Sequence, residues 1–466
     1  MEHDVVVIGT GVAGAAAAVA AAEADDSLDV AMVERAPEGE HAGNSRYTDA
    51  YMRLEADGSP AENFREDFQE FSNGKADEAV VDRIATDAKP TIDWLREHGV
   101  EFEQLETMFL TANRPRLLPV GGGLAIVDAL LDDARDLGVS IHFETTAEAL
   151  ERERGAGIQG LWVRDDTGSS ELIETDNVVI ACGGFEGNPQ MLAEYVEGDV
   201  TDLPTIAPGG EKNMGEGIRM ATDVGAATDG QFKQFHAEPI DPRCDAPEAA
   251  IMAFPYGILV NKHGERFVDE GGRTVDEHYE YVSRRIREQP DGRAYLIADQ
   301  KIFDVPKIEH SLQTTEDPIE AEPDYAADED PLVTTVENLG AQIDVDTERL
   351  FETVSAYNDA INDAEFDPFT TDGKAAAVDP PKSNWAQALD TPPLVCWPMQ
   401  CSIVMTFGGV ATDDRARVVN PDGRAIPGLY AAGEVTGLYF DKYAGATSVL
   451  RGLVFGRLAG QEIASR

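Results

Sequence analysis

The chain has 466 residues, and its 88 acidic against 37 basic side chains give a formal net charge of −51. This charge argues against nucleic acid and anionic membranes as partners, because both are negative themselves. At this length we expect two or three domains rather than one hydrophobic core.

No apolar run approaches the roughly 20 residues of a membrane-spanning helix. The chain enters its first apolar strand directly, so we expect no signal peptide and a cytoplasmic location. The acidic residues are dispersed, and a lysine-poor acidic surface is typical of proteins from salt-loving, halophilic organisms. We expect reduced thiols and no metal site, because no CxxC spacing or histidine cluster accompanies the four cysteines, Cys182, Cys244, Cys396 and Cys401.

The first stretch predicts a dinucleotide site. An apolar strand over 4–8 runs into Gly9, Gly11 and Gly14, and a small-residue helix follows over 15–22. The first glycine permits a tight turn, the second lets backbone approach a pyrophosphate, and the third lets helix and strand pack closely. The free N–H groups at the helix N-terminus favour a phosphate charge.

A second strand over 29–33 ends on Glu34, about 20 residues after the glycines, where an acid can accept a ribose hydroxyl. Strand, glycines, helix, strand and acid in this order make the nucleotide interpretation much stronger than a glycine motif alone. The polar loop 38–46 that follows could wrap a nucleotide or be only a turn.

The next part of the chain reads as helical over 61–98. Arg114 and Arg116 then stand just before the glycines 121–123, which open a predicted helix over 124–137. Paired arginines before a glycine loop suggest an anion site, and the alternative is a pair neutralised by surface carboxylates.

Short strands are expected over 139–143, 157–164 and 171–174, and a buried strand over 177–182 ends on glycines. The segment from about 235 to 398 differs in texture and reads as an inserted domain. Its predicted elements are a hairpin over 257–267, a helix over 274–288, a loop-rich stretch over 304–331 and a helix that starts near 346.

The C-terminal part returns to the first texture. A strand over 428–432 ends in Gly433-Glu434, and a terminal helix opens within 443–452. The nucleotide domain is therefore expected to be split, with its last strand and helix supplied by the C-terminus.

Together these motifs resemble the flavoprotein family of fumarate reductase and succinate dehydrogenase. The matching pieces run in the family's order along the whole chain. They are the first glycine motif, Gly43-Asn44-Ser45, Ala181-Cys182-Gly183-Gly184-Phe185, Gly264–Glu270, Ala432–Gly437 and Phe455–Gly460. Within the family, the resemblance to soluble tricarballylate dehydrogenases is carried by Gly43–Arg46, the helix start at Gly121–Gly123 and the ending Tyr443–Arg457.

The resemblance implies an α/β fold: a Rossmann-like, discontinuous FAD-binding domain of the GR2 type over 1–235 and 399–466, with an inserted α+β capping domain over 236–398. FAD is the implied cofactor. We expect it to be non-covalent, because the loop 43–48 has no His and His41 lies upstream of it. The implied FAD-binding residues are Gly9, Gly11, Gly14, Glu34, Asn44, Ser45, Gly122, Ala147, Gly183, Gly433, Glu434, Ser448 and Leu450.

The resemblance implies three catalytic residues, Arg273, His236 and Tyr443. Arg273 follows the Arg266–Glu270 segment one residue closer than usual and would carry a proton. His236 keeps only the first position of the family's His-Pro-Thr. Tyr443 stands where the family has a substrate-clamping arginine, and a second family His is absent at 404–409. The plainer alternatives are an ion-paired Arg273, an interior His236 and a Tyr443 that only packs.

The implied reaction interconverts a C–C single bond and an alkene in a small carboxylic acid, with an unidentified electron acceptor or donor. Arg46, Arg114, Arg116 and Lys442 are the candidate substrate-binding residues. Alternatives are a fumarate, succinate or urocanate enzyme, an enone enzyme of the ketosteroid kind, an electron-transferring flavoprotein subunit, and an FAD-binding relative without chemistry.

Overall fold

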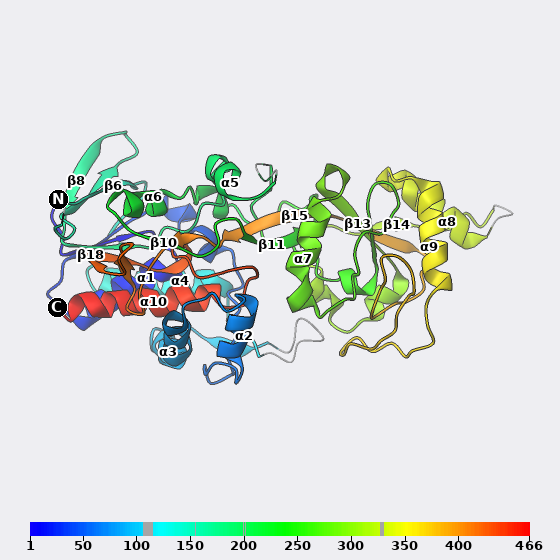
Figure 1. Cartoon of the computed structure of the whole chain (residues 1–466), viewed down its shortest axis with the longest axis horizontal. Helices are drawn as coiled ribbons and strands as arrows, with labels where there is room; N and C mark the ends of the chain where they lie inside the picture. The colour runs from blue at the N-terminus through cyan, green and yellow to red at the C-terminus, as the bar shows by residue number, and fades with distance from the viewer. Residues whose placement is uncertain (106–114, 154, 199, 201, 327–329) are drawn as a thin grey trace. The chain divides into compact units, whose positions relative to one another are not determined.

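A computed structural model describes residues 1–105, 115–153, 155–198, 200, 202–326 and 330–466. Within these residues the chain forms two compact units, one from 1–236 together with 404–466 and the other from 237–403 (Figure 1). Both changes of unit fall inside strands, because β11 spans Phe235–Ile240 and β15 spans Leu394–Thr406. The sequence interpretation placed them at 235/236 and 398/399.

The first unit is built on a six-stranded sheet with the order β17-β18-β9-β1-β2-β5. All neighbours pair in parallel except β17 and β18. The chain leaves β1 for β2 on one side and later returns to β9 on the other, so the crevice after β1 and β9 is a topological switch point, where such sheets bind ligands. The strands are β1 (Val5–Ile8), β2 (Val30–Val33), β5 (Ser140–His142), β9 (Asn177–Ile180), β17 (Arg417–Val419) and β18 (Ala425–Ala431).

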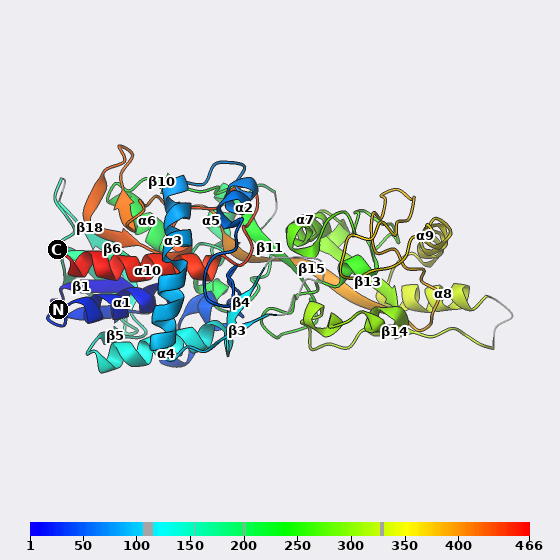
Figure 2. The same ribbon diagram turned by 90° about the horizontal axis from the view of Figure 1, so that it is seen from below.

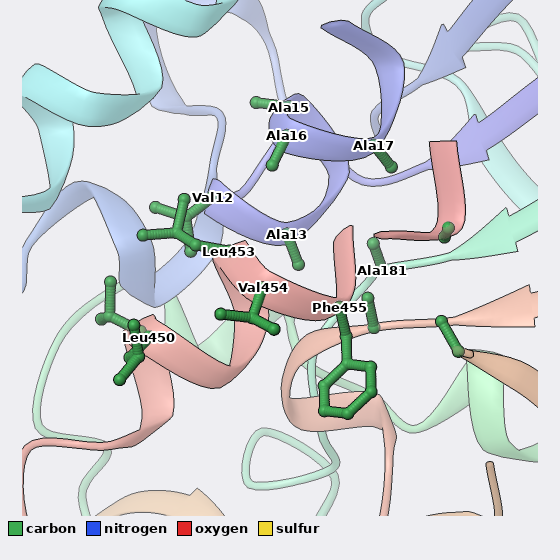
Figure 3. Packing of buried hydrophobic residues seen from close by; sticks show 14 of the residues in the cluster. Val12, Ala13, Ala15, Ala16, Ala17, Ala181, Leu450, Leu453, Val454 and Phe455 are labelled. Atoms are coloured by element: carbon green, nitrogen blue, oxygen red, sulfur yellow. The ribbon is translucent and has the colours of Figure 1, made fainter. Parts of the chain in front are cut away.

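Two helices from opposite ends of the chain pack in contact on this sheet. α1 (Val12–Ala24) is almost entirely small and buried, and α10 (Ser448–Ala464) crosses it through glycines. A Cβ added to Gly456 would lie 2.1 Å from the carbonyl oxygen of Ala13. Figure 3 shows Val12 and Ala13 of α1 against Leu453 and Val454 of α10. The C-terminal helix is thus part of the core that supports the first glycine turn.

The other helices of the first unit are α2 (Phe64–Phe71), α3 (Glu78–Glu97), α4 (Gly122–Asp136), α5 (Pro189–Tyr195) and α6 (Glu216–Asp223). The stretch 61–98, predicted to be helical, forms α2 and α3 with a turn at 72–77 between them. Asp77 starts the second helix by accepting hydrogen bonds from the N–H groups of Ala79 and Val80.

Smaller sheets complete this unit. They pair β3 (Phe102–Gln104) with β4 (Leu117–Pro119), β6 (Thr146–Glu151) with β7 (Gly160–Arg164) and β8 (Ser170–Glu174), and β10 (Thr228–Asp229) with β16 (Gly409–Val410). Short 3₁₀ turns in the chain are η1 (Glu38–Glu40), η2 (Gly43–Arg46), η3 (Gly210–Lys212), η4 (Phe254–Tyr256), η5 (Pro290–Gly292), η6 (Gln300–Asp304), η7 (Ile308–Ser311) and η8 (Gly433–Val435).

The second unit is centred on a sheet with the order β11-β15-β13-β12, in which β14 (Ile319–Ala321) also pairs with β15. β13 pairs in antiparallel fashion with both β12 and β15. β12 (Ile258–Val260) pairs mainly with β13 (Arg293–Asp299), and the hairpin expected over 257–267 amounts to one bridge between Val260 and Arg266. Its helices are α7 (Val275–Arg287), α8 (Pro331–Ile343) and α9 (Thr347–Asp359), seen in Figure 2. None of the helices in the described parts of either unit is long and apolar enough to cross a membrane.

Candidate functional site

The glycine turn after β1 forms a cradle at the N-terminus of α1. Gly9 has φ +98°, and a Cβ there would lie 2.5 Å from the carbonyl oxygen of Ala181. Gly11 precedes the helix, and its Cβ would lie 3.0 Å from Ser45 Oγ. Val12 N donates to that same hydroxyl at 3.2 Å. The 43–46 turn therefore folds over the helix start, where N–H groups favour an anion.

Glu34 lies at the end of β2 and is held in place by Thr10 of the glycine turn after β1. It is buried, and one carboxylate oxygen accepts from Thr10 N at 3.0 Å and from Thr10 Oγ1 at 2.7 Å. The other oxygen accepts from Ala36 N at 2.9 Å. His41 Nδ1 lies 3.5 Å from Thr10 Oγ1, and burial lowers the pKa of His41. An anchored carboxylate acceptor thus stands beside the glycine cradle.

A cluster of polar side chains lies at the carboxyl end of β9. Glu186 is buried, and its Oε1 accepts from Asn44 Nδ2 at 2.9 Å and from Asn213 Nδ2 at 2.6 Å. Glu434 Oε1 accepts from Thr406 N at 2.9 Å and from Thr406 Oγ1 at 3.3 Å. Burial, followed by the charge of Glu434, holds the pKa of Glu186 well above its usual range, and burial also raises the pKa of Glu434. The sequence interpretation missed Glu186, although an acid directly after the Gly183-Gly184-Phe185 strand end was a usable signal.

The start of α10 is closed by a tyrosine. Tyr443 is buried, its hydroxyl accepts from Thr447 N and Ser448 N at 3.0 Å each, and it donates to Ser448 Oγ at 3.0 Å. The ring of His236 lies 4.4 Å from the ring of Tyr443, centroid to centroid. Two of the three predicted catalytic residues are therefore brought together at this helix start.

Two buried arginines support that helix start, and sequence reasoning did not single out either one. Arg53 Nη1 bonds Asp67 at 2.8 Å, and its Nε donates to the carbonyl oxygen of Gly445 at 3.1 Å. Arg451 lies over the ring of Tyr439 with its guanidinium carbon 4.6 Å from the centroid. Both guanidinium groups thus hold the 439–447 segment in position.

The remaining predicted FAD residues lie in the first unit. Gly122 opens α4, where a Cβ would lie 2.9 Å from the carbonyl oxygen of Thr48. Ala147 is buried in β6 opposite Val163. Gly183 (φ +75°) lies against Asn213, and Gly433 (φ +80°) lies against Ala13 of α1. Leu450 is buried within α10.

The predicted substrate-binding residues within the described structure lie on separate segments of the first unit. Arg46 acts electrostatically on Glu40 and His41. Arg116 is buried beside β4, and its Nη1 donates to the carbonyl oxygen of Pro115 at 3.3 Å. Lys442 is exposed. Arg114 lies outside the described residues.

Arg273 belongs to the second unit and is exposed just before α7. The carboxylate of Glu270, three residues earlier, is paired instead with Arg266, with Nη2 to Oε2 at 2.6 Å. Lys382 is buried, and its Nζ lies 3.9 Å from Oε2 of the same carboxylate. Burial lowers the pKa of this lysine to about 8. This network fixes the backbone that leads to Arg273 and leaves the Arg273 guanidinium at the surface.

The first unit has the features that FAD requires. The glycine cradle suits a pyrophosphate and Glu34 suits a ribose, while Asn44 Oδ1 and Glu186 Oε2 are buried oxygens without a hydrogen-bond partner in the described chain. Among the described residues no group of three or more His, Cys, Asp or Glu could hold a metal ion. The fold and the site define a dinucleotide-binding flavoprotein.

Comparison with known proteins agrees with this class of protein. The family described as FAD binding domain matches residues 4–448, so the chain belongs to that family. It is 26% identical to a vinyl phenol reductase of Lactiplantibacillus plantarum, over 95% of this chain and 91% of the relative. It is 28% identical to a fumarate reductase (cytochrome) of Shewanella frigidimarina, over 99% of this chain and 77% of the relative.

Among solved structures, the open conformation of a flavocytochrome c3 fumarate reductase superposes with a TM-score of 0.80 at 25% identity, covering 100% of this chain and 78% of that one. The predicted fold class, a Rossmann-like FAD-binding domain with a capping domain, is confirmed. FAD as the cofactor is confirmed too, and the protein is an FAD-dependent oxidoreductase.

Proposed function

We propose that this enzyme interconverts a C–C single bond and an alkene in a small organic acid. The observation that carries the proposal is the pairing of His236 with Tyr443 at the start of α10, in a unit built to hold FAD. Support comes from relatives whose names state reduction of fumarate and of vinyl phenol, both of which contain a carbon–carbon double bond.

In this proposal bound FAD supplies hydride transfer between its N5 and a substrate carbon. Arg273 exchanges the proton at the neighbouring carbon, which a general acid–base residue must do in the same step. His236 binds the polar group of the substrate, and Tyr443 orients His236 through the contact of the two rings. The helix start at Ser448 favours negative charge that develops close to it.

The favoured substrate is a polycarboxylate of the tricarballylate kind, which the sequence motifs suggest. Arg46, Arg116 and Lys442 would bind its carboxylates. A second candidate is an uncharged alkene such as an enone or a hydroxystyrene. Tyr443 favours this candidate, because a neutral phenol stands where the family has an arginine that binds a substrate carboxylate. The two buried arginines nearby, Arg53 and Arg451, are already bonded to the protein.

The test is anaerobic bleaching of the bound flavin by saturated acids, and reoxidation of the reduced flavin by their alkenes. The panel contains tricarballylate and aconitate, succinate and fumarate, and an enone and a hydroxystyrene as uncharged compounds. We expect one pair to bleach and restore the flavin. A holoprotein that exchanges electrons with no member of the panel would contradict the proposal.

The role of Arg273 is tested with Arg273→Ala. Loss of a positioned proton carrier should lower kcat by about 10²–10⁴-fold, with FAD still bound because Arg273 lies outside the FAD-holding unit. The matched control is Arg349→Ala, which removes a half-exposed arginine from α9 of the same unit and should leave kcat unchanged. Turnover near the original value in Arg273→Ala would remove this residue from the mechanism.

A further inference from the structure

Glu186 and Glu434 lie at the ligand-binding edge of the first unit, where a Cβ built on Gly184, two residues before Glu186, would lie 2.2 Å from Glu434 Oε1. β9 and β18 are parallel neighbours, so the segments that follow them leave the sheet at the same edge as the glycine turn after β1. Glu186 follows β9 and Glu434 follows β18. Both carboxyl groups therefore stand at the switch-point crevice, where sheets of this topology bind their ligands.

The donors around the two groups are neutral. Glu186 Oε1 accepts from the amides of Asn44 and Asn213, and Glu434 Oε1 accepts from the backbone and hydroxyl of Thr406. Glu186 Oε2 is buried and has no donor among the described residues. An ionised neighbouring carboxylate has no proton to offer, so two ionised groups here would leave this oxygen unsatisfied.

One proton shared by the two carboxyl groups satisfies the unbonded Glu186 Oε2 and removes the repulsion between two negative charges. Two carboxylates at one buried place cannot both ionise without a large repulsion, and one of them then keeps its proton. Arg451 of α10 acts electrostatically on Glu434 and favours its charged form. Burial, the Glu434 charge and the hydrogen bond to Glu434 all raise the pKa of Glu186, whereas the Asn213 hydrogen bond lowers it. The retained proton is therefore assigned mainly to Glu186, bonded towards Glu434.

We propose that Glu186 and Glu434 form a carboxyl pair that holds one proton in the FAD site, so that FAD affinity falls as rising pH removes that proton. Bound FAD displaces water from the crevice and adds the negative charge of its two phosphates to the same unit. Both effects favour the protonated pair, so the pair holds its proton more tightly with FAD than without it.

The direction of the pH effect follows from this linkage. Below the pH at which the FAD-free pair loses its proton, affinity is at its full value. Above it, FAD binding must take up a proton, and affinity falls until the FAD-bound pair also ionises. This inference concerns the cofactor and is independent of the substrate proposed above.

The experiment uses the holoprotein and FAD alone. It is diluted in buffers from about pH 6 to about pH 9 at constant KCl, and the fluorescence of released flavin gives the Kd of FAD; we expect Kd to rise by up to about tenfold per pH unit, the slope of one proton. A Kd that does not change across this range would overturn the proposal.

Glu186→Gln assigns the effect. Its amide oxygen can still accept from Asn44 and Asn213, but it does not titrate, so we expect a Kd that no longer depends on pH. The matched control is Glu66→Gln, an exposed carboxylate on α2 of the same unit, which should repeat the original pH curve. A Glu186→Gln protein that repeats that curve would also overturn the proposal. Should this variant fail to fold, Glu434→Gln removes the other member and should likewise abolish the pH dependence.

Discussion

At the scale of single residues, Tyr443 shows how one side chain can serve a helix and a site together. Its hydroxyl accepts two backbone N–H groups at the start of α10 and donates to Ser448 Oγ. These three bonds use the full capacity of a phenol. Tyr443 would therefore have to give up a bond to the helix before it could bond a substrate, and we assign it to positioning His236.

Tyr443→Phe tests this assignment. The two N–H groups lose their acceptor in a buried place, which should lower the free energy of unfolding by about 1–3 kcal/mol. Urea unfolding of the holoprotein gives this quantity. Tyr325→Phe, at an exposed position, should change it little. An unchanged stability in Tyr443→Phe would show that water or other groups replace the hydroxyl.

At the scale of elements, α1 and α10 form the joint that holds the glycine cradle. The small residues of α1 were evident from the sequence, but only the packed structure shows that Gly456 meets the backbone of Ala13. Spacing along one helix does not reveal which residue of another helix it will touch. The helical pattern over 61–98 likewise did not reveal the turn at 72–77 that separates α2 from α3.

Gly456→Ala tests this joint. A Cβ 2.1 Å from a carbonyl oxygen forces the helices apart, and such overpacking costs about 1–3 kcal/mol. We expect a lower thermal midpoint and weaker FAD binding, since the N-terminus of α1 moves with the joint. Gly39→Ala is the control, because a Cβ there meets nothing within 4 Å. Equal midpoints for the two variants would contradict this account.

At the scale of the whole molecule, the large negative net charge is the feature that we expect to affect stability most. If all 37 basic side chains were paired, a net charge of −51 would still repel itself. Salt shortens the range of this repulsion from about 10 Å at 0.1 M to about 3 Å at 1 M. We therefore expect the thermal midpoint of the holoprotein to rise steadily with KCl. Sucrose, which does not screen charge, serves as the control, and a midpoint that falls or stays constant in KCl would contradict the expectation.

The sequence by itself determined those features of this protein that depend on a short stretch of residues or on a recognisable motif. The strand–glycine–helix turn and Glu34 predicted a Rossmann-like nucleotide site, because each depends on backbone geometry within a few residues. FAD followed from the family resemblance that the order of the motifs along the chain supports. α8 shows the limit of such patterns, since its start at Asp330-Pro331 is a usual helix signal at the end of the stretch 304–331, which was predicted as loop-rich.

Only the tertiary structure decided which distant groups meet. Asn44 and Glu186 lie 142 residues apart in sequence, and Thr406 and Glu434 join them from the C-terminal part of the chain. No periodicity records such a meeting, because it depends on how parallel strands are ordered in the sheet. Burial likewise decided that Arg53 and Arg451 hold the 439–447 segment while Arg273 stays exposed. The charge of an arginine can be read from the sequence, but its environment is set by the fold.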